Sequence, residues 1–199
     1  MKAVILHGLY MHGIVMMPLA KRLHGYGFDT EVLSYNSVSI SEKSLFESID
    51  KSLDPYGQNI LIGHSLGGIL IKRYLASRKP SIDTISHVVA LGSPINGSSI
   101  ARKLSNVGAS LVLGNAIEHG LIEDDTQWHF PQKLFSIAGR LPIGIRPILI
   151  RDGEESDGTV TVNETKIDGM FKHQVIDSSH TSIIYSKLTA ELINQFVIE

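Results

Sequence analysis

Residues 58–75 read QNILIGHSLGGILIKRYL and place a serine, Ser65, between an apolar run and a segment with helical periodicity. The run Asn59–Ile62 has the length and composition of a buried strand, and Leu66–Ser77 follows as a helix. Glycines two residues before and two residues after the serine complete a Gly-x-Ser-x-Gly frame, which is typical of a sharp strand-to-helix turn that exposes a serine hydroxyl. Because so short a pattern also arises by chance, the rest of the chain must supply its structural context.

Short apolar runs alternate with longer helical segments along the whole chain. Several of the runs are continuously apolar, as expected for parallel strands that are covered on both faces. The predicted strands are Ala3–Leu6, Thr30–Leu33, Asn59–Ile62, His87–Leu91, Leu134–Ala138 and His173–Ile176. The predicted helices are Ile14–His24, Glu42–Leu53, Leu66–Ser77 and Ser182–Val197. This order predicts a three-layer α/β domain with a mostly parallel central sheet of about six strands and helices on both faces.

The composition indicates one domain of ordinary charge. With 199 residues, of which 43% are hydrophobic, residues 1–199 can bury one substantial core and are expected to form a single domain. The balance of 18 basic against 20 acidic residues argues against a surface that binds nucleic acid. Since the chain contains no cysteine, disulfides, thiol nucleophiles and thiolate metal ligands are excluded, and a cytoplasmic location is expected.

The apolar segments are too short for a membrane. The first run, Ala3–Leu6, is shorter than the roughly 7–15 residues of a signal-peptide core. No apolar stretch approaches the roughly 18 residues that a membrane-spanning helix requires. We therefore expect no stable insertion into a membrane.

Polar residues gather directly after four of the predicted strands. They are His7-Gly8, Gly63–Gly68, Ser93-Pro94 and Ser178–Thr181. Ligands of open parallel sheets bind beyond the carboxyl ends of the strands, so these four clusters predict a site at one edge of the sheet. The segment 93–130 shows no clear strand. We expect it to form one or two helices over this edge, as a lid-like or substrate-access segment.

Ser65 requires a base, because a serine hydroxyl is a weak nucleophile by itself. Among the nine histidines, His180 follows the last predicted strand and precedes the C-terminal helix, which places it at the same edge as Ser65. His64 is adjacent to Ser65 in the sequence, so its side chain is expected to point elsewhere and to support the turn. His180 is therefore the predicted general base.

The base in turn requires an acid that fixes its tautomer and stabilises the imidazolium. Asp157 is the preferred candidate, because Gly158 permits a turn directly after it and because it gives the order Ser, Asp, His along the chain. Glu155 and Asp177 remain as alternatives. Asp177 lies only three residues before His180 and is expected to end the last strand.

Two backbone N–H groups are expected to stabilise the negative charge of a tetrahedral intermediate. One belongs to Leu66, the residue after the predicted nucleophile, and the other belongs to Leu9 in the loop HGLYMHG (7–13). Gly8 lets this part of the backbone approach a substrate. His7 either braces the loop or is a buried structural histidine, and neither role is catalytic.

Five stretches, taken together, resemble the α/β-hydrolase superfamily, in particular its small lipase-like and esterase-like bacterial members that lack a large cap. They are VILHGL (4–9), LIGHSLGG (61–68), VVALGSPINGS (88–98), ESDGTVTVNETKIDGM (155–170) and VIDSSHTSI (175–183). The last three discriminate best, because they occur together and in the order of the family. The resemblance implies an α/β-hydrolase fold and the hydrolysis of esters through an acyl-enzyme, without a metal or an organic cofactor.

The resemblance also implies roles for particular residues of this chain. The implied catalytic triad and oxyanion donors are Ser65, Asp157 and His180, with the backbone N–H groups of Leu9 and Leu66. Tyr10 and Met11 are bulky where relatives often have small or polar residues, so they are expected to narrow the acyl or alcohol pocket.

The natural substrate stays open at this point. We expect a lipid-like or small carboxylic ester, with a preference for short or medium acyl chains. A thioesterase, an amidase or an acyltransferase would use the same triad, and a catalytically silent binding module would keep the same fold. A flavodoxin-like nucleotide binder is disfavoured, because HGLYMHG lacks the glycine spacing of a phosphate-binding loop. The sequence does not predict the oligomeric state.

Overall fold

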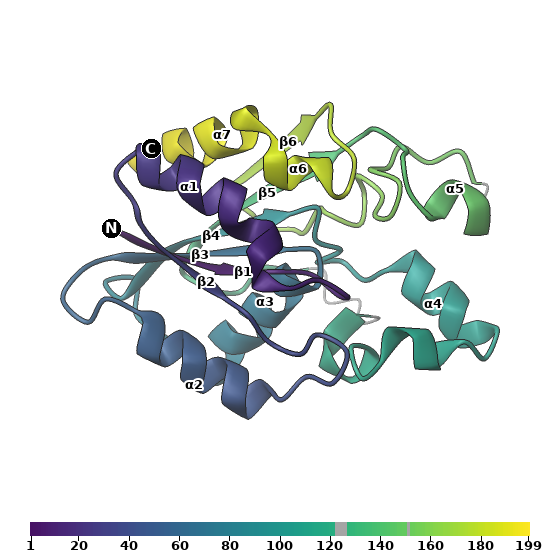
Figure 1. The fold of residues 1–199 in the computed structure, drawn as a ribbon, viewed down its shortest axis with the longest axis horizontal. Coiled ribbons are helices and arrows are strands. Elements are labelled where there is room, and N and C mark those ends of the chain that lie inside the picture. Colours follow the sequence, from purple (N-terminus) through teal and green to yellow (C-terminus); the bar gives the residue numbers. More distant parts are fainter. Residues whose placement is uncertain (122–126, 151) are drawn as a thin grey trace.

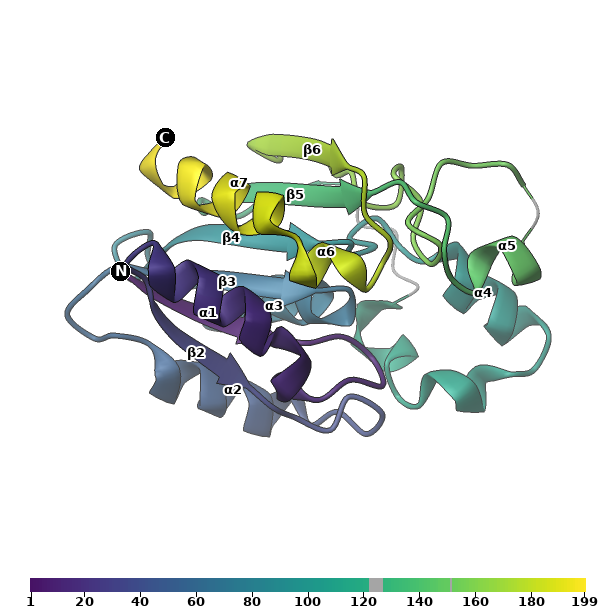
Figure 2. The ribbon, with the colours of Figure 1, turned by 45° about the horizontal axis from the view of Figure 1, so that its top comes forward.

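A parallel sheet forms the centre of the protein in the computed structural model, which describes residues 1–121, 127–150 and 152–199. Its six strands lie in the order β2-β1-β3-β4-β5-β6, and each pairs in parallel with its neighbours (Figures 1 and 2). The strands are β1 (Lys2–Leu6), β2 (Asp29–Leu33), β3 (Asn59–His64), β4 (Ile85–Leu91), β5 (Lys133–Gly139) and β6 (Lys172–Ile176). The predicted strands are confirmed, and each observed strand extends one or two residues beyond the predicted range at one end, or at both ends in β5.

Helices cover both faces of the sheet, which confirms the three-layer prediction. Figure 1 shows α1, α6 and α7 on one face and α2 and α3 on the other. The bounds are α1 (Met17–Gly25), α6 (Ser182–Tyr185) and α7 (Lys187–Ile198) on the first face, and α2 (Glu42–Ser52) and α3 (Leu66–Arg78) on the second. Within the described part of the chain, none of the helices combines the length and the apolar character needed to cross a membrane.

Two of the predicted helices differ in detail from the observed ones. The predicted helix Ile14–His24 begins with a 3-10 turn, η1 (Gly13–Met16), and becomes α-helical only at α1. The predicted helix Ser182–Val197 is interrupted at Ser186, whose extended backbone (φ −69°, ψ 131°) ends α6 and begins α7. The interruption follows the packing, since α6 buries Ile183 and Ile184 completely against the sheet.

The continuous apolar runs are explained by two cores, one on each face of the sheet. Successive side chains of a strand point to opposite faces. In β3, Leu61 therefore packs with the α2 and α3 side of the molecule, whereas Ile60 and Ile62 pack with the α1 and α7 side. Each of these residues is fully buried. Burial of such a side chain contributes about 1.5–3 kcal/mol, so both faces of the sheet favour the fold.

The remaining helical elements lie beyond the carboxyl ends of the strands (Figure 1). They are α4 (Ser99–Asn106), the 3-10 turn η2 (Ser110–Leu113), the irregular turn η3 (Ile117–Leu121) and α5 (Arg146–Leu149). The segment 93–130 thus contains one α-helix and two short turns among its described residues, while 122–126 lie outside them. The lid-like role of this segment stays a prediction.

Candidate active site

Ser65 occupies the turn between β3 and α3 in a backbone conformation that side chains rarely adopt. Its φ is 52° and its ψ is −121°. Such a conformation costs on the order of 1–3 kcal/mol and persists only where the surroundings hold it in place. Here the Ser65 N–H donates to the carbonyl of Leu91 (2.9 Å), and the Ser65 carbonyl accepts from the N–H of Gly68 (3.1 Å). The turn therefore has the geometry of a nucleophile elbow.

The glycines around the elbow are required by close contacts between backbone segments. A Cβ atom on Gly63 would lie 2.4 Å from the carbonyl carbon of Gly67. A Cβ atom on Gly67 would lie 2.7 Å from the carbonyl oxygen of Leu6 in β1. A side chain at either position would push the start of α3 away from the sheet, and Ser65 would move with it.

The structure brings Ser65, His180 and Asp157 together in one chain of hydrogen bonds. His180 lies between β6 and α6, and its Nδ1 is 2.7 Å from Asp157 Oδ2. Since a carboxylate only accepts, Nδ1 carries the proton, and Nε2 accepts from Ser65 Oγ at 3.0 Å. The His180 N–H also donates to the carbonyl of Asp157 (2.8 Å), so the acid and the base are linked through the main chain as well.

The carboxylate of Asp157 is held on both of its oxygens. The residue is only 1% exposed. Oδ1 accepts from the N–H groups of Thr159 (2.9 Å) and Val160 (2.7 Å), which leaves Oδ2 for His180. Hydrogen bonds to a charged acceptor are shorter and stronger than neutral ones, so this turn fixes the direction of the carboxylate.

The alternative acids lie elsewhere. Asp177 is exposed and pairs with Arg140, and the guanidinium holds the pKa of the Asp177 carboxyl below its ordinary value. Glu155 is also exposed to solvent. Of the three candidates, the structure brings only Asp157 to the imidazole of His180.

Two glycines that the sequence interpretation did not single out make room for the side chains of Asp157 and His180. Gly92 follows β4 with a φ of +52°, and a Cβ atom there would lie 2.9 Å from Asp157 Oδ2. Gly139 ends β5, and its Cβ atom would lie 2.8 Å from the Cβ of Asp157. In the sequence, the glycines at the carboxyl ends of β4 and β5 could have indicated this space, because these strand ends meet at one edge of the sheet.

The loop after β1 packs directly on the elbow. A Cβ atom on Gly8 would lie 3.1 Å from Ser65 Cβ, so the backbone that leads into Leu9 is next to the serine. Leu66 is the first residue of α3, and the first N–H groups of a helix have no intrahelical acceptor. Leu9 and Leu66 are thus both placed beside Ser65, and their function as oxyanion donors stays a prediction.

His7 is both buried and bonded to its own loop. Its side chain is fully buried, and its Nδ1 donates to the carbonyl of Gly8 (2.9 Å). Its Nε2 accepts from the N–H of Tyr35 (3.2 Å), whose hydroxyl donates to the His7 carbonyl (2.6 Å). The two rings also stack, with centroids 4.2 Å apart. Burial lowers the pKa of His7, so the imidazole is neutral and joins the loop to the segment after β2.

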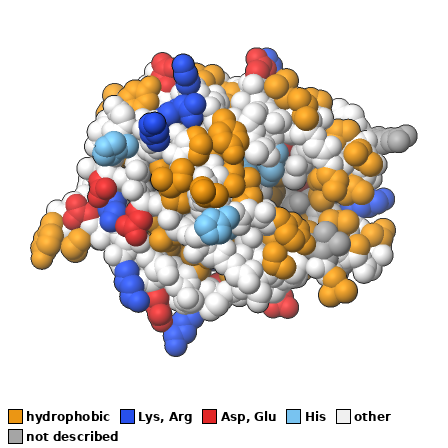
Figure 3. Space-filling view, in the orientation of Figure 1, with side chains coloured by type: hydrophobic (Ala, Val, Ile, Leu, Met, Phe, Trp, Pro, Cys, Tyr) orange, Lys and Arg blue, Asp and Glu red, His pale blue; other side chains and the backbone are white. Residues whose placement is uncertain are grey.

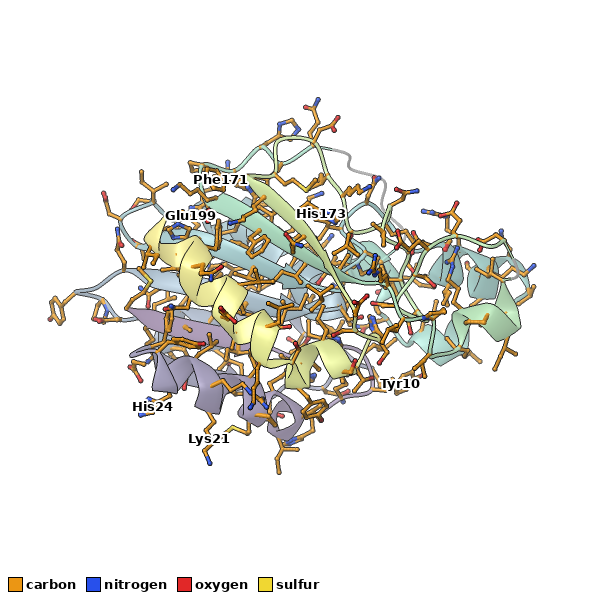
Figure 4. The ribbon with its side chains drawn as sticks, turned by 90° about the horizontal axis from the view of Figure 1, so that it is seen from above. Tyr10, Lys21, His24, Phe171, His173 and Glu199 are labelled. Carbon is orange, nitrogen blue, oxygen red and sulfur yellow. The ribbon has the colours of Figure 1, made fainter. Side chains whose placement is uncertain are left out.

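Tyr10 and Met11 differ in their exposure. The Tyr10 side chain is 61% exposed on a backbone with a φ of 58°. Figure 4 shows Tyr10 near the carboxyl ends of the strands, whereas Phe171 and Glu199 lie toward the opposite end. Met11 is partly buried and packs against the core on the α1 side. Of these two residues of the loop, Tyr10 therefore faces solvent and Met11 faces the core. Their contact with a substrate stays a prediction.

Within the described residues, no three histidine or acidic side chains lie close enough together to hold a metal ion. The chemistry that this arrangement can perform is nucleophilic attack by a serine hydroxyl, with His180 to carry the proton and Asp157 to stabilise the imidazolium.

Solved structures share this architecture at low sequence identity. The mature form of a Bacillus licheniformis lipase superposes with a TM-score of 0.74 at 18% identity, covering 98% of this chain and 91% of that chain. A metagenomic carboxyl esterase gives 0.71 at 15% identity, with 98% and 74% covered. The thioesterase domain from the nocardicin cluster gives 0.61 at 13% identity, with 100% and 94% covered. No protein-family model matches the chain, and no curated protein matches it in sequence.

The likeness at these identities shows the fold. The parallel six-stranded sheet, the helices on both of its faces and the likeness to solved structures show that this chain has the α/β-hydrolase fold, as the sequence predicted.

Proposed function

We propose that the protein is a serine hydrolase that cleaves carboxylic esters through an acyl-enzyme. The observation that carries the proposal is the hydrogen-bonded chain from Ser65 Oγ through His180 to Asp157, with separations of 3.0 and 2.7 Å. The strained conformation of Ser65 supports the same proposal, because strain of this kind gathers at functional sites.

Acylation begins when Ser65 Oγ attacks the carbonyl carbon of the ester. His180 Nε2 takes the hydroxyl proton, and Asp157 stabilises the imidazolium that forms. The backbone N–H groups of Leu66 and Leu9 donate to the oxyanion of the tetrahedral intermediate. The intermediate then collapses as the ester C–O bond breaks. The leaving alkoxide takes the proton from His180 and departs as an alcohol, which leaves an acyl group on Ser65.

Deacylation repeats these steps with water as the nucleophile. His180 Nε2 accepts a proton from the water while the water oxygen attacks the acyl carbonyl carbon. The second tetrahedral intermediate collapses with Ser65 Oγ as the leaving group, and the proton on His180 returns to it. A carboxylic acid is released, and the free enzyme is restored.

The surroundings of the site favour an ester with an apolar acyl or alcohol part. Tyr10 in the loop after β1 is 61% exposed, and Ile14 in η1 is 70% exposed. On the segment that leads to Asp157, Ile143 is 72% exposed. Figure 3 shows hydrophobic side chains gathered over η1 and α1 and near α5 on this face of the molecule. The segment 93–130 contributes α4 at the same edge of the sheet, and we propose that it governs substrate access.

A fluorophosphonate probe and a series of p-nitrophenyl esters of increasing acyl length test the proposal. We expect the probe to label the parent protein at Ser65, and Ser65→Ala to lose both labelling and ester turnover while keeping its thermal unfolding transition. Ser179→Ala is the matched control, since its hydroxyl is one residue from His180 but bonds to Ser182 instead. Undiminished turnover by Ser65→Ala would contradict the assignment of the nucleophile.

Matched thioester and amide substrates then separate ester hydrolysis from the other reactions of the same triad. Faster turnover of the thioester than of the corresponding oxygen ester would assign a thioesterase instead. A parent protein that neither reacts with the probe nor hydrolyses any member of the series would indicate a catalytically silent module.

A further inference from the structure

We propose that His64 is a positioning residue that holds the main chain of His180, so that the elbow and the loop of the base keep a fixed separation. The inference rests on the proposed function for its catalytic consequence, but the contact itself is a feature of the fold. His64 ends β3, directly before Ser65. Its Nε2 lies 2.8 Å from the carbonyl oxygen of His180, which is 116 positions away in the sequence.

The hydrogen bond defines the tautomer of His64. A carbonyl oxygen only accepts, so Nε2 of His64 must carry the proton, and Nδ1 is then unprotonated. Nδ1 is buried and has no hydrogen-bond partner among the described residues. It faces the loop after β1 instead, since a Cβ atom on Gly8 would lie 3.1 Å from it. The imidazole therefore contacts both loops that flank Ser65.

Burial keeps this imidazole neutral. The His64 side chain is fully buried, and desolvation lowers its pKa to about 3, with His180 as a second cause. The two rings are close, with centroids 4.8 Å apart. A neutral neighbour matters here, because a positive charge at this distance would oppose the formation of the imidazolium on His180. His64 can thus hold the base loop without competing for its proton.

Two kinds of contact fix His180 as a result. Its ring is held by Ser65 and Asp157, which fix the direction of Nε2 and Nδ1. Its main chain is held at the N–H by the Asp157 carbonyl (2.8 Å) and at the carbonyl by His64. The bond from Ser65 joins the ring of His180 to the elbow, and the main-chain bond to Asp157 joins His180 to a different loop. The contact from His64 joins the main chain of His180 to the elbow itself, since His64 directly precedes Ser65.

Three substitutions separate this role from a general effect of burial. His64→Leu removes the donor at similar volume, whereas His64→Gln retains an amide N–H near the position of Nε2. His87→Leu is the matched control, because His87 is also a buried histidine (8% exposed) but pairs with Ile60 in the sheet, four residues before His64. We expect the kcat of His64→Leu on p-nitrophenyl butyrate to fall about 10–100-fold, since a displacement of about 1 Å costs about 100-fold.

The KM of His64→Leu should stay within about twofold of the parent value, because the substrate pocket is unchanged and only the base is displaced. His64→Gln should recover most of the kcat, and His87→Leu should keep it. A His64→Leu variant with parental kcat, or a His64→Gln variant no better than His64→Leu, would overturn the proposal. If His64→Leu does not fold, His64→Asn replaces it, since its amide is too short to reach the His180 carbonyl.

Amide hydrogen exchange provides a readout that does not depend on activity. The N–H groups of Ser179 and His180 should exchange faster in His64→Leu than in the parent, and at parental rates in His64→Gln and His87→Leu. Unchanged exchange in His64→Leu refutes the contact. If the parent protein hydrolyses no ester and does not react with a phosphonate, the proposed function fails, while the exchange rates still decide whether His64 holds the loop.

Discussion

The loop that follows α5 and the loop that follows β6 each bring an aspartate close to His180, one in space and one in sequence. Asp157 is 23 positions from His180 and bonds to its ring, whereas Asp177 precedes His180 by three residues and points into solvent. Asp157 accepts two backbone N–H bonds besides the bond from His180. Asp177 pairs with the guanidinium of Arg140 at the surface. The aspartate that bonds to His180 is therefore not the one nearest to it in the sequence but one that the fold brings to it from another loop.

The largest expected effect comes from removing the charge of the buried aspartate. Asp157→Asn should lower kcat by about 10⁴-fold, because an amide no longer enforces the Nδ1–H tautomer of His180. Asp177→Asn should leave kcat within about twofold of the parent. Steady-state kinetics on one p-nitrophenyl ester, with both variants at the same pH, checks the pair. If the two results were reversed, the carboxylate near His180 in sequence would be the functional one.

A smaller effect is expected from narrowing the space around the acid and the base. Gly92→Ala places a methyl group 2.9 Å from Asp157 Oδ2 and 3.3 Å from His180 Nδ1, at a backbone φ of +52°. We expect the free energy of unfolding to fall by about 1–3 kcal/mol, and kcat to fall with it by about 10-fold or more. Urea unfolding and ester kinetics give the two quantities. Gly153→Ala, at a φ of +74° with no neighbouring atom within 4 Å, is the control for backbone strain alone. Equal losses of kcat in both variants would contradict the contact with the acid–base pair.

The smallest expected effect is that of the exposed Asp177 on the pH dependence of the free energy of unfolding. Arg140 lowers the pKa of Asp177 in the folded protein, chiefly through their hydrogen bond. A carboxyl group whose pKa is lower in the folded than in the unfolded protein stabilises the fold above the unfolded pKa of about 4. This stabilisation is lost as the pH falls through the folded pKa. Because the pair is exposed, the contribution is small and is screened by salt.

Urea unfolding of the parent and of Asp177→Asn between about pH 2 and pH 7 tests this expectation. The parent should be slightly more stable above about pH 4, and the difference should vanish in more acidic solution and at high salt. A difference that persists at acidic pH would show that Asp177 acts on stability through something other than its charge.

The fold was predictable because the four inner strands, β1, β3, β4 and β5, are buried on both faces. Leu61 and its neighbours in β3 pack into the cores on opposite faces of the sheet, so the sequence shows an uninterrupted apolar run that is readily recognised. The interruption at Ser186 was not predictable, because Ser182–Val197 keeps a helical pattern throughout. There the packing of Ile183 and Ile184 overrides the local preference.

The placement of Ser65 and His180 was predicted from topology and that of Asp157 from its order along the chain, whereas the contacts that hold these residues were not predictable. Ser65 and His180 follow the ends of β3 and β6, and parallel strands end at one edge of the sheet. Asp157 follows α5 instead, and it lies beside Gly139 at the end of β5. The bond from Tyr35 to the His7 carbonyl spans 28 positions, and the bond from His64 to the His180 carbonyl spans 116. Such contacts depend on distances between loops, and no local pattern in the sequence encodes them.

The backbone of Ser65 has a consequence for how stability and activity compete in this protein. A φ of 52° with a ψ of −121° is a conformation that glycine adopts without strain and serine does not. The backbone at this position therefore favours glycine, although the residue there is a serine. If the hydroxyl is the nucleophile, the most stable sequence for this turn is an inactive one, and any selection for thermal stability alone would drive the chain toward losing its reaction.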